Sequence, residues 1–187
     1  AEEVLGQQAG AQHALLMLDM DGFKQINDTF GHAAGDQALL DTAAILRSMV
    51  RDSDLICRLG GDEFLVWLRD IAYDAVIDKI ARQICEQVRK AFSEKIEISA
   101  SVGVAVYPRD GREFDELYHN ADKALYRVKQ TGKNDYAFFS AGERTQPEAA
   151  PETVEAVRPV MRTGLRVKRR MLIVDDSSTS RAVLESF

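Results

Sequence analysis

The chain has 187 residues, of which 45% are hydrophobic and 29% are charged, a balance typical of a soluble globular protein with one domain and an appendage. Its formal net charge of -6 argues against bulk electrostatic binding of nucleic acid, although a nucleotide can still bind together with a divalent cation. No apolar run approaches the roughly 20 residues that a membrane span needs, and no signal peptide opens the chain, so we expect a cytoplasmic protein without a membrane span.

The first half of the chain alternates apolar runs with helical periodicity. In chain order, we predict a strand at 14–18, a short helix at 23–30, a turn at 31–36, a helix at 39–50, and strands at 55–59 and 64–68. The last two strands flank the sequence GGDE. Two strand-like runs around a short loop that contains glycine predict a β-hairpin.

The second half continues the pattern up to Ser140. Here we predict a helix at 76–88, a strand at 96–108, a helix at 114–128 that ends before Gly132, and a strand at 136–139. Strands and helices in this order favour an α+β domain, with a mostly antiparallel central sheet flanked by helices.

The composition changes after Ser140. Three of the four prolines fall in the next twenty residues, together with few large apolar side chains, so residues 141–169 are predicted to be a linker. The segment 170–187 then has the pattern of one strand entering one helix. A single strand and helix cannot bury a core of their own, so we expect this segment to be disordered, or to dock on the preceding domain or on a neighbouring chain.

Two pairs of acidic residues occur where predicted strands end. Asp19 and Asp21 follow the first strand, and Asp62 and Glu63 occupy the hairpin tip. If these strands are neighbours in one sheet, the carboxylates converge and repel one another, and a divalent cation such as Mg²⁺ relieves that repulsion. The alternative is that Gly60 and Gly61 serve only the turn and that the acids are merely solvated.

Other residues are suited to bind phosphate or a base. The sequence DGFK at 21–24 opens a helix, where free backbone N–H groups favour anions. The candidate cations for phosphate are Lys24, Lys129 and Lys133. An amide and a carboxylate can together match the acceptor and donors of a guanine edge, which makes Asn27 and Asp36 candidate guanine ligands. The alternatives are helix capping for Asp36 and plain surface positions for the lysines.

Several ordered motifs resemble one family. LDMDGFKQINDTFGHAAGD, RLGGDEF, SASVGVAVYP and ADKALYRVKQTGKN resemble the GGDEF family of diguanylate cyclases, and the resemblance runs from about residue 14 to 139. It implies a fold like the palm of nucleotide cyclases and polymerases. It also implies condensation of two GTP molecules to cyclic di-GMP with release of pyrophosphate, and a homodimer in which each domain holds one GTP.

The resemblance also implies residue roles. Asp19, Asp62 and the Met20 carbonyl match the ligands of Mg²⁺ or Mn²⁺, and Asp62 and Glu63 match the catalytic acids. The positions that hold substrate are Gly22, Phe23, Lys24, Asn27, Asp36, Lys129 and Lys133. The family more often has arginine where Lys133 stands, so this chain retains the charge but loses bidentate geometry. Asp62 is expected to help accept the proton of the attacking 3′-hydroxyl.

A second motif resembles the product-inhibition site of the family. The sequence RDSD places Arg51 and Asp54 at the family's R-x-x-D offset before Gly60, which implies binding of cyclic di-GMP. The arginine can donate bidentate hydrogen bonds to guanine or phosphate acceptors of cyclic di-GMP, and the carboxylate can accept hydrogen bonds from guanine N–H groups. An alternative to the enzyme is a non-catalytic module that binds cyclic di-GMP or GTP. The undamaged GGDEF motif favours the enzyme.

The resemblance suggests boundaries at both ends. Family members usually carry a further helix before the first strand, and only its tail fits into the residues before Ala14, so we predict a GGDEF domain over 1–140 with a truncated N-terminal helix. The segment 170–187 resembles the opening strand and helix of a response-regulator receiver domain, of which Asp175 and Asp176 match the acidic pair. It is therefore predicted to be a truncated, receiver-like segment typical of two-component signalling.

Overall fold

The computed structural model describes residues 12–92 and 98–140, and the backbone of 171–173. Its elements are β1 (Gln12–Asp21), α1 (Phe23–Phe30), α2 (His32–Met49), β2 (Leu55–Gly60), β3 (Glu63–Ile71), α3 (Asp74–Phe92), β4 (Ser99–Tyr107), α4 (Phe114–Thr131), β5 (Tyr136–Phe138) and β6 (Met171–Ile173). Each strand and helix predicted up to Ser140 has its counterpart here, and the elements differ from the prediction mainly in length.

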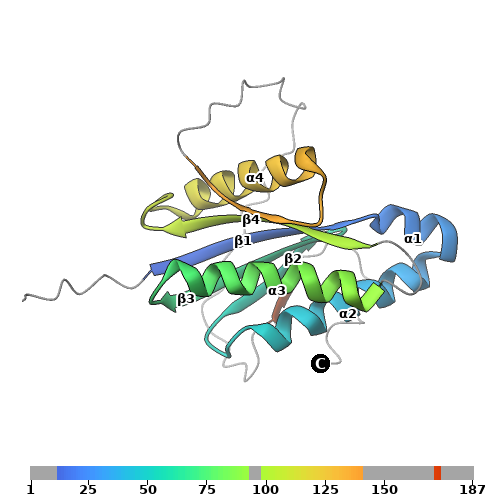
Figure 1. The fold of residues 1–187 in the computed structure, drawn as a ribbon. Coiled ribbons are helices and arrows are strands. Elements are labelled where there is room, and N and C mark those ends of the chain that lie inside the picture. Colours follow the sequence, from blue (N-terminus) through green and yellow to red (C-terminus); the bar gives the residue numbers. More distant parts are fainter. Residues whose placement is uncertain (1–11, 93–97, 141–170, 174–187) are drawn as a thin grey trace, which may run out of the picture.

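The strands form one sheet in the order β5-β4-β1-β3-β2-β6. β1 pairs antiparallel with both β3 and β4, and β2 pairs antiparallel with β3. β5 and β6 add parallel strands at the two edges. Figure 1 shows α4 on one face of the sheet and α2 and α3 on the other. The predicted α+β class, with a mostly antiparallel sheet flanked by helices, is confirmed.

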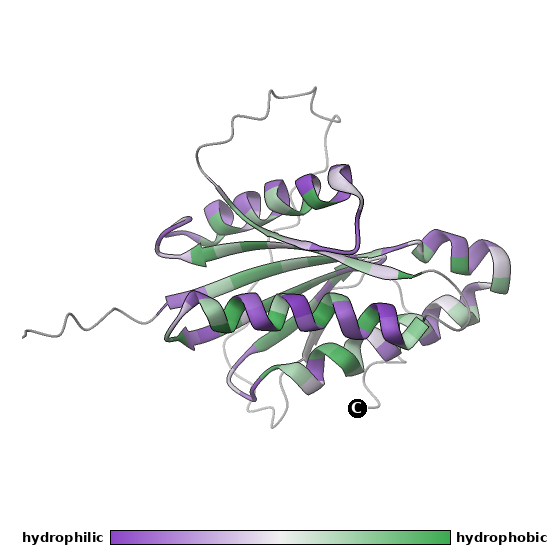
Figure 2. Cartoon of the chain, viewed as in Figure 1, coloured by the Kyte–Doolittle hydropathy of each residue, from purple (hydrophilic) through white to green (hydrophobic). Residues whose placement is uncertain are grey.

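β1 is buried on both faces because helices cover both sides of the sheet. The run 14–18 is at most 2% exposed, and its side chains alternate between two hydrophobic clusters. Leu15 and Met17 face the cluster that contains residues of α4. Ala14, Leu16 and Leu18 face the larger cluster, which contains residues of α2 and α3. Figure 2 shows apolar residues along the central strands and on the side of α4 that is turned toward the sheet. Because side chains alternate along a strand, Asp19 and Asp21 continue the series on the α4 side.

The α4-facing side of β4 carries small residues at every position before its last residue, Tyr107. They are Ser99, Ser101, Gly103 and Ala105. A Cβ atom added to Gly103 would lie 2.1 Å from the carbonyl oxygen of Ala121 and 2.3 Å from the backbone nitrogen of Leu125. The backbone of α4 therefore packs directly on β4, which brings the C-terminal turn of this helix close to the end of β1.

Replacing Gly103 by alanine is expected to destabilise the fold, because the clash is with backbone atoms that cannot rotate away. Overpacking of a filled core costs roughly 1–3 kcal/mol, and denaturant unfolding would measure it as a lower midpoint. Lys79→Ala on the exposed side of α3 is the control and should change the midpoint little. An unchanged midpoint for Gly103→Ala would contradict the close packing of α4.

The turn predicted at 31–36 is wrong except at its first residue. Only Gly31 leaves helical geometry, with φ 82°, and α2 already begins at His32. A single glycine at positive φ is enough to separate α1 from α2. The alanines that follow are strong helix formers, so the helix starts seven residues before the predicted Leu39. Asp36 consequently lies inside α2 and does not cap it.

Several predictions fall outside the described residues. They include the linker 141–169, the N-terminal residues 1–11 and most of the receiver-like segment 170–187. The exception is the backbone of β6, which pairs parallel with Ile56–Arg58 of β2. Within the described parts of the chain, no helix is both long enough and apolar enough to cross a bilayer.

Candidate functional site

The C-terminal end of β1 and the tip of the β2–β3 hairpin meet at one end of the central strands of the sheet. Asp19 is the register partner of Glu63, and the backbone N–H of Met20 donates to the carbonyl oxygen of Asp62 at 3.2 Å. Asp19 and Asp62 both line an open cavity of about 670 Å³, which falls in the usual size range for small-molecule sites. The convergence of the two acidic pairs expected from the sequence is therefore present.

The conformation of the hairpin tip depends on a glycine and a buried arginine. Gly61 has φ 54°, a left-handed conformation that favours glycine. Arg58 is only 7% exposed, and its Nε and Nη2 donate to the carbonyl oxygen of Gly61 at 3.0 and 2.8 Å. The guanidinium thus fixes the carbonyl of Gly61, the residue that directly precedes Asp62.

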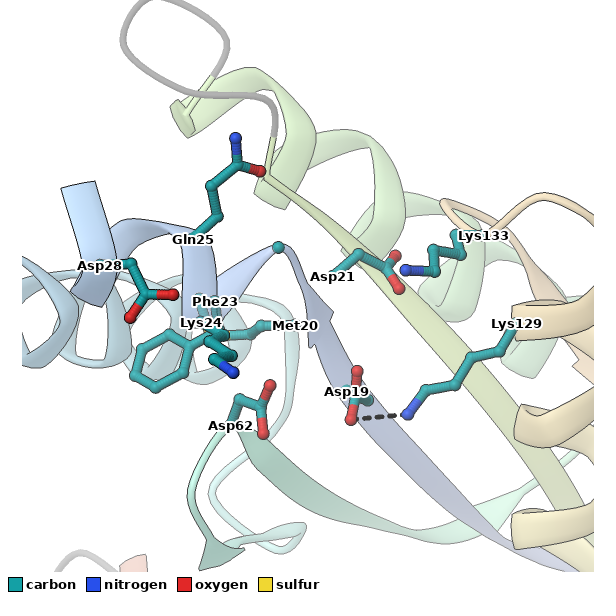
Figure 3. A pocket seen from close by; sticks show the side chains of 11 residues that line it. Asp19, Met20, Asp21, Phe23, Lys24, Gln25, Asp28, Asp62, Lys129 and Lys133 are labelled. Atoms are coloured by element: carbon teal, nitrogen blue, oxygen red, sulfur yellow. Dashed lines mark ion pairs between the residues drawn. The ribbon is translucent and has the colours of Figure 1, made fainter.

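The cavity unites most of the predicted metal and phosphate residues (Figure 3). Its lining consists of Asp19, Met20, Asp21, Gly22, Phe23, Lys24, Gln25, Asp28, Asp62, Lys129 and Lys133. Sequence reasoning named Asp21 only as one of the converging acids, and it gave no role to Gln25 or Asp28. Asp28 stands one helical turn after Lys24 on α1, so helical spacing from Lys24 could have identified it. Asp21 was visible in the D-x-D pattern, but no partner could be assigned to it.

Two of the residues that line the cavity form an ion pair. The Lys129 ammonium at the C-terminal end of α4 lies 2.7 Å from Oδ2 of Asp19, and Figure 3 draws this contact. Burial, and secondly the charge of Asp19, raise the pKa of Asp62 above its usual value. The same two causes, in the same order, raise the pKa of Glu63. The site therefore holds more negative charge than Lys129 neutralises.

These oxygens are suited to a hard divalent cation. Within residues 12–92 and 98–140, no three His, Cys, Asp or Glu side chains are arranged as a metal site. Asp19 and Asp62 would thus have to be joined by backbone and substrate oxygens. Mg²⁺ commonly binds through one or two carboxylates together with substrate phosphates. The Asp19 carboxylate already pairs with one positive charge here, the ammonium of Lys129.

The start of α1 faces the same cavity. Gly22 precedes this helix with φ 83°, and no side chain caps its N-terminus. The N–H groups of an uncapped first turn favour an anion, and Gly22, Phe23 and Lys24 line the cavity there. Lys133 reaches it from the turn after α4. The predicted phosphate residues are therefore arranged around one space, from two sides.

Asn27 and Asp36, the predicted guanine ligands, lie outside the cavity lining. Asn27 is half-buried on α1 and Asp36 is exposed on α2. The Oδ1 atom of Asn27 lies 2.0 Å from the point where a Cβ on Gly35 would stand. The amide of Asn27 therefore rests on the bare backbone of Gly35, next to Asp36. Glu63 is also outside the lining, although it lies opposite Asp19 in the sheet.

Arg51 and Asp54 lie at the other end of β2 from the hairpin tip. Arg51 is exposed, whereas Asp54 is 3% exposed. The carboxylate of Asp54 accepts hydrogen bonds from the backbone N–H groups of Arg51 at 2.8 Å and Arg69 at 2.9 Å. Asp54 thus fastens the 51–54 turn to β3, and Arg51 is the member of the pair that is presented to solvent.

Comparison with known proteins gives consistent matches. The family described as "Diguanylate cyclase, GGDEF domain" matches residues 2–135. The chain is 37% identical over 164 residues to the bifunctional diguanylate cyclase/cyclic di-GMP phosphodiesterase MucR of Pseudomonas aeruginosa, covering 86% of this chain and 23% of MucR. It is 40% identical over 129 residues to diguanylate cyclase A of Treponema denticola, covering 65% of this chain and 33% of that protein.

A solved structure also matches the fold. The GGDEF domain of DgcB from Caulobacter crescentus, in complex with c-di-GMP, has a TM-score of 0.62 and 29% sequence identity. The match covers 69% of this chain and 78% of that one. Against the curated relatives, by contrast, the chain spans only between about a quarter and a third of their length.

Proposed function

Because the chain belongs to the GGDEF family of diguanylate cyclase domains, we propose that it condenses two GTP molecules into cyclic di-GMP and releases pyrophosphate. The observation that carries this proposal is the cavity at the end of β1. It combines the carboxylates of Asp19 and Asp62 with the cations of Lys24, Lys129 and Lys133. Carboxylates for a cation and ammonium groups for phosphate are the combination that phosphoryl-transfer chemistry needs.

Asp19 and Asp62, with the Met20 carbonyl, would hold Mg²⁺ or Mn²⁺. When bound, this cation would neutralise the triphosphate and lower the pKa of the attacking 3′-hydroxyl. Lys24 and the backbone N–H groups at the start of α1 bind the phosphates from one side, and Lys129 and Lys133 bind them from the other. Positioning and charge neutralisation then provide most of the catalysis.

The hairpin acids have a second role in this proposal. Asp62 accepts the proton of the 3′-hydroxyl on its carboxylate, and Glu63, the next residue in the chain, is the second candidate for this task. In the metal-free site the pKa of both groups is raised, mainly by burial. Asn27 and Asp36 bind the guanine edge, with the amide donating to the acceptor and the carboxylate accepting from the N–H groups.

Each copy of the chain holds one GTP, so two copies have to face each other for reaction. The 3′-hydroxyl of each GTP attacks the α-phosphate of the other, so that two phosphodiester bonds form, two pyrophosphates leave and the ring closes. A two-fold homodimer matches the two-fold symmetry of the product.

Incubation with GTP and Mg²⁺ followed by chromatography tests the proposed reaction directly. Cyclic di-GMP and pyrophosphate in a ratio of one to two are expected. Binding of GTP without any product in a dimeric preparation would contradict the enzyme, and would favour the alternative of a non-catalytic nucleotide-binding module.

The stabilisation that Mg²⁺ gives is expected to depend on pH. The pKa values of Asp62 and Glu63 are raised in the folded state, so this state binds more protons than the unfolded chain between the usual and the raised values. Without a cation, stability therefore falls as pH rises through that window. Because Mg²⁺ needs the ionised acids, its increment in melting temperature is present above the window and disappears below it. Thermal unfolding with Mg²⁺ and with EDTA across pH measures this, and a pH-independent increment would contradict it.

We also propose that cyclic di-GMP inhibits the enzyme at Arg51 and Asp54. Support comes from the exposed guanidinium of Arg51 beside a turn that Asp54 fastens from within. Titration calorimetry with cyclic di-GMP should show weaker binding for Arg51→Ala than for the wild type. Because Asp54 accepts two backbone hydrogen bonds, Asp54→Ala should also lower stability. Equal affinities of wild type and Arg51→Ala would remove the site from this turn.

A further inference from the structure

Asp21 is a buried carboxylate to which the reaction proposed above gives no role. It is the last residue of β1 and is 7% exposed. Its oxygens accept hydrogen bonds from the Ser99 hydroxyl at 2.8 Å and from the Ser101 hydroxyl at 2.9 and 3.0 Å. The backbone N–H of Asn134 also donates to it, at 3.2 Å. Asp21 thus joins three segments that lie far apart in the sequence.

The two serines explain why this carboxylate has one fixed orientation. Ser99 is the register partner of Asp21, and Ser101 is the register partner of Asp19 on the same side of the sheet. Both hydroxyls therefore reach the carboxylate from β4, on the face that α4 covers. A buried carboxylate is tolerated where several donors surround it, and here they aim it at the turn that follows α4.

That turn has an unfavourable backbone conformation. Lys133 and Asn134 have φ 63° and 52°, a left-handed conformation that residues other than glycine adopt at an energetic cost. Both residues are exposed, so apolar burial does not hold them. Their backbone is fixed by polar contacts, with the N–H of Lys133 on the carbonyl of Val128 at 3.0 Å and the N–H of Asn134 on Asp21.

The turn carries one of the cations of the cavity. Lys133 and Asp21 both line this cavity, and in Figure 3 their side chains extend toward one another. Displacement of the turn would therefore displace the Lys133 ammonium. Asp21 itself has its two oxygens occupied by donors of the protein, which leaves it poorly suited to contact a ligand directly.

We propose that Asp21 is a positioning residue, which holds the Lys133–Asn134 turn so that the Lys133 ammonium meets the triphosphate. This inference rests on the proposed function for the identity of the ligand. It assigns to the second aspartate of the D-x-D pattern a task different from that of the first. Asp19 acts on the cation, and Asp21 acts through the backbone of the turn that follows α4.

Two substitutions in the full chain test the inference. Asp21→Asn keeps the shape and an oxygen that can accept from Asn134. Asp21→Ser keeps a hydroxyl beside the two serines but is too short to reach the turn. For each variant, amide exchange of Asn134 is measured without nucleotide. The affinities for GMP and for a GTP analogue with an uncleavable α–β bridge are then measured with Mg²⁺. The ratio of the two affinities, here called the triphosphate gain, measures what the β- and γ-phosphates add to binding.

Asp21→Ser is expected to accelerate exchange at Asn134 and to reduce the triphosphate gain about tenfold, the effect of losing one charge-assisted contact. Asp21→Asn should retain most of both. In a Lys133→Ala background, Asp21→Ser should cause no further loss of the triphosphate gain, because both changes remove the same contact.

Three results would overturn the inference. One is wild-type exchange and wild-type triphosphate gain in Asp21→Ser. Another is a loss in Asp21→Ser that adds fully to that of Lys133→Ala. The third is a loss of Mg²⁺ affinity with unchanged exchange, which would make Asp21 a cation ligand. A wild type that binds GMP and the analogue equally contradicts the proposed function instead, and the exchange of Asn134 then decides the inference alone.

Discussion

Replacing Asp62 by asparagine is expected to abolish most GTP turnover while it stabilises the unliganded fold. The substitution removes a proposed cation ligand and proton acceptor, so the rate of cyclic di-GMP formation should fall by at least about 100-fold. Burial and the neighbouring Asp19 raise the pKa of Asp62, which means that the folded state disfavours the ionised carboxylate. A neutral amide of the same shape removes that penalty at neutral pH.

The opposite signs of the two effects make this test sharp. Steady-state turnover and thermal unfolding in EDTA are measured on the same preparations. Asp70→Asn, exposed near the far end of β3, the strand that Asp62 precedes, is the matched control and should change neither quantity strongly. Full turnover in Asp62→Asn would contradict the proposed site. A large loss of both turnover and stability would indicate a structural defect of the hairpin rather than the loss of a catalytic group.

Replacing Gly35 by alanine is expected to weaken GTP binding without weakening the fold. The new methyl group would stand 2.0 Å from Oδ1 of Asn27, and this side chain can rotate away. Gly35 lies inside α2, where alanine is ordinarily favoured over glycine by roughly 0.5–1 kcal/mol. The unfolding midpoint should therefore stay or rise. The KM for GTP should rise about tenfold, because the displaced amide would lose the hydrogen bond to guanine that we propose for it.

Two further variants identify Asn27 as the cause. Adding Gly35→Ala to Asn27→Ala should raise KM no further, since the amide is then already absent. Gln37→Ala, exposed on the same helix, changes helix propensity without touching Asn27 and should leave KM unchanged. A normal KM in Gly35→Ala would show that GTP binding does not depend on the packing of the Asn27 amide against the backbone of Gly35.

Most of the fold follows from local patterns in the sequence. The hairpin around GGDE and the central strand were predictable because alternation and glycine placement are properties of short segments. The turn at 31–36 was mispredicted because two glycines, Gly31 and Gly35, look alike in the sequence. One of them ends a helix through its backbone conformation, whereas the other lies in a helix and makes room for Asn27. Only the packing of α1 on α2 distinguishes the two.

The candidate site was predictable to the extent that its residues cluster in motifs. Asp19 and Asp62 come from two acidic pairs at strand ends, and sheet pairing brings them together. The network of Asp21 could not be read in the same way. Its hydrogen bonds join residues 78 to 113 positions apart, and serines and a backbone N–H carry no distinctive signal in a sequence.

The ion pair of Lys129 with Asp19 has a thermodynamic consequence if the proposed ligands bind here. A cation that arrives alone has to displace the ammonium from Asp19, whereas a triphosphate draws that ammonium toward itself and leaves the carboxylate available. Cation and nucleotide then bind cooperatively, and each strengthens the other by the same factor. The lysine would thereby compete with the cation for Asp19, neutralise part of the negative charge of the empty site, and release the carboxylate only when both ligands bind.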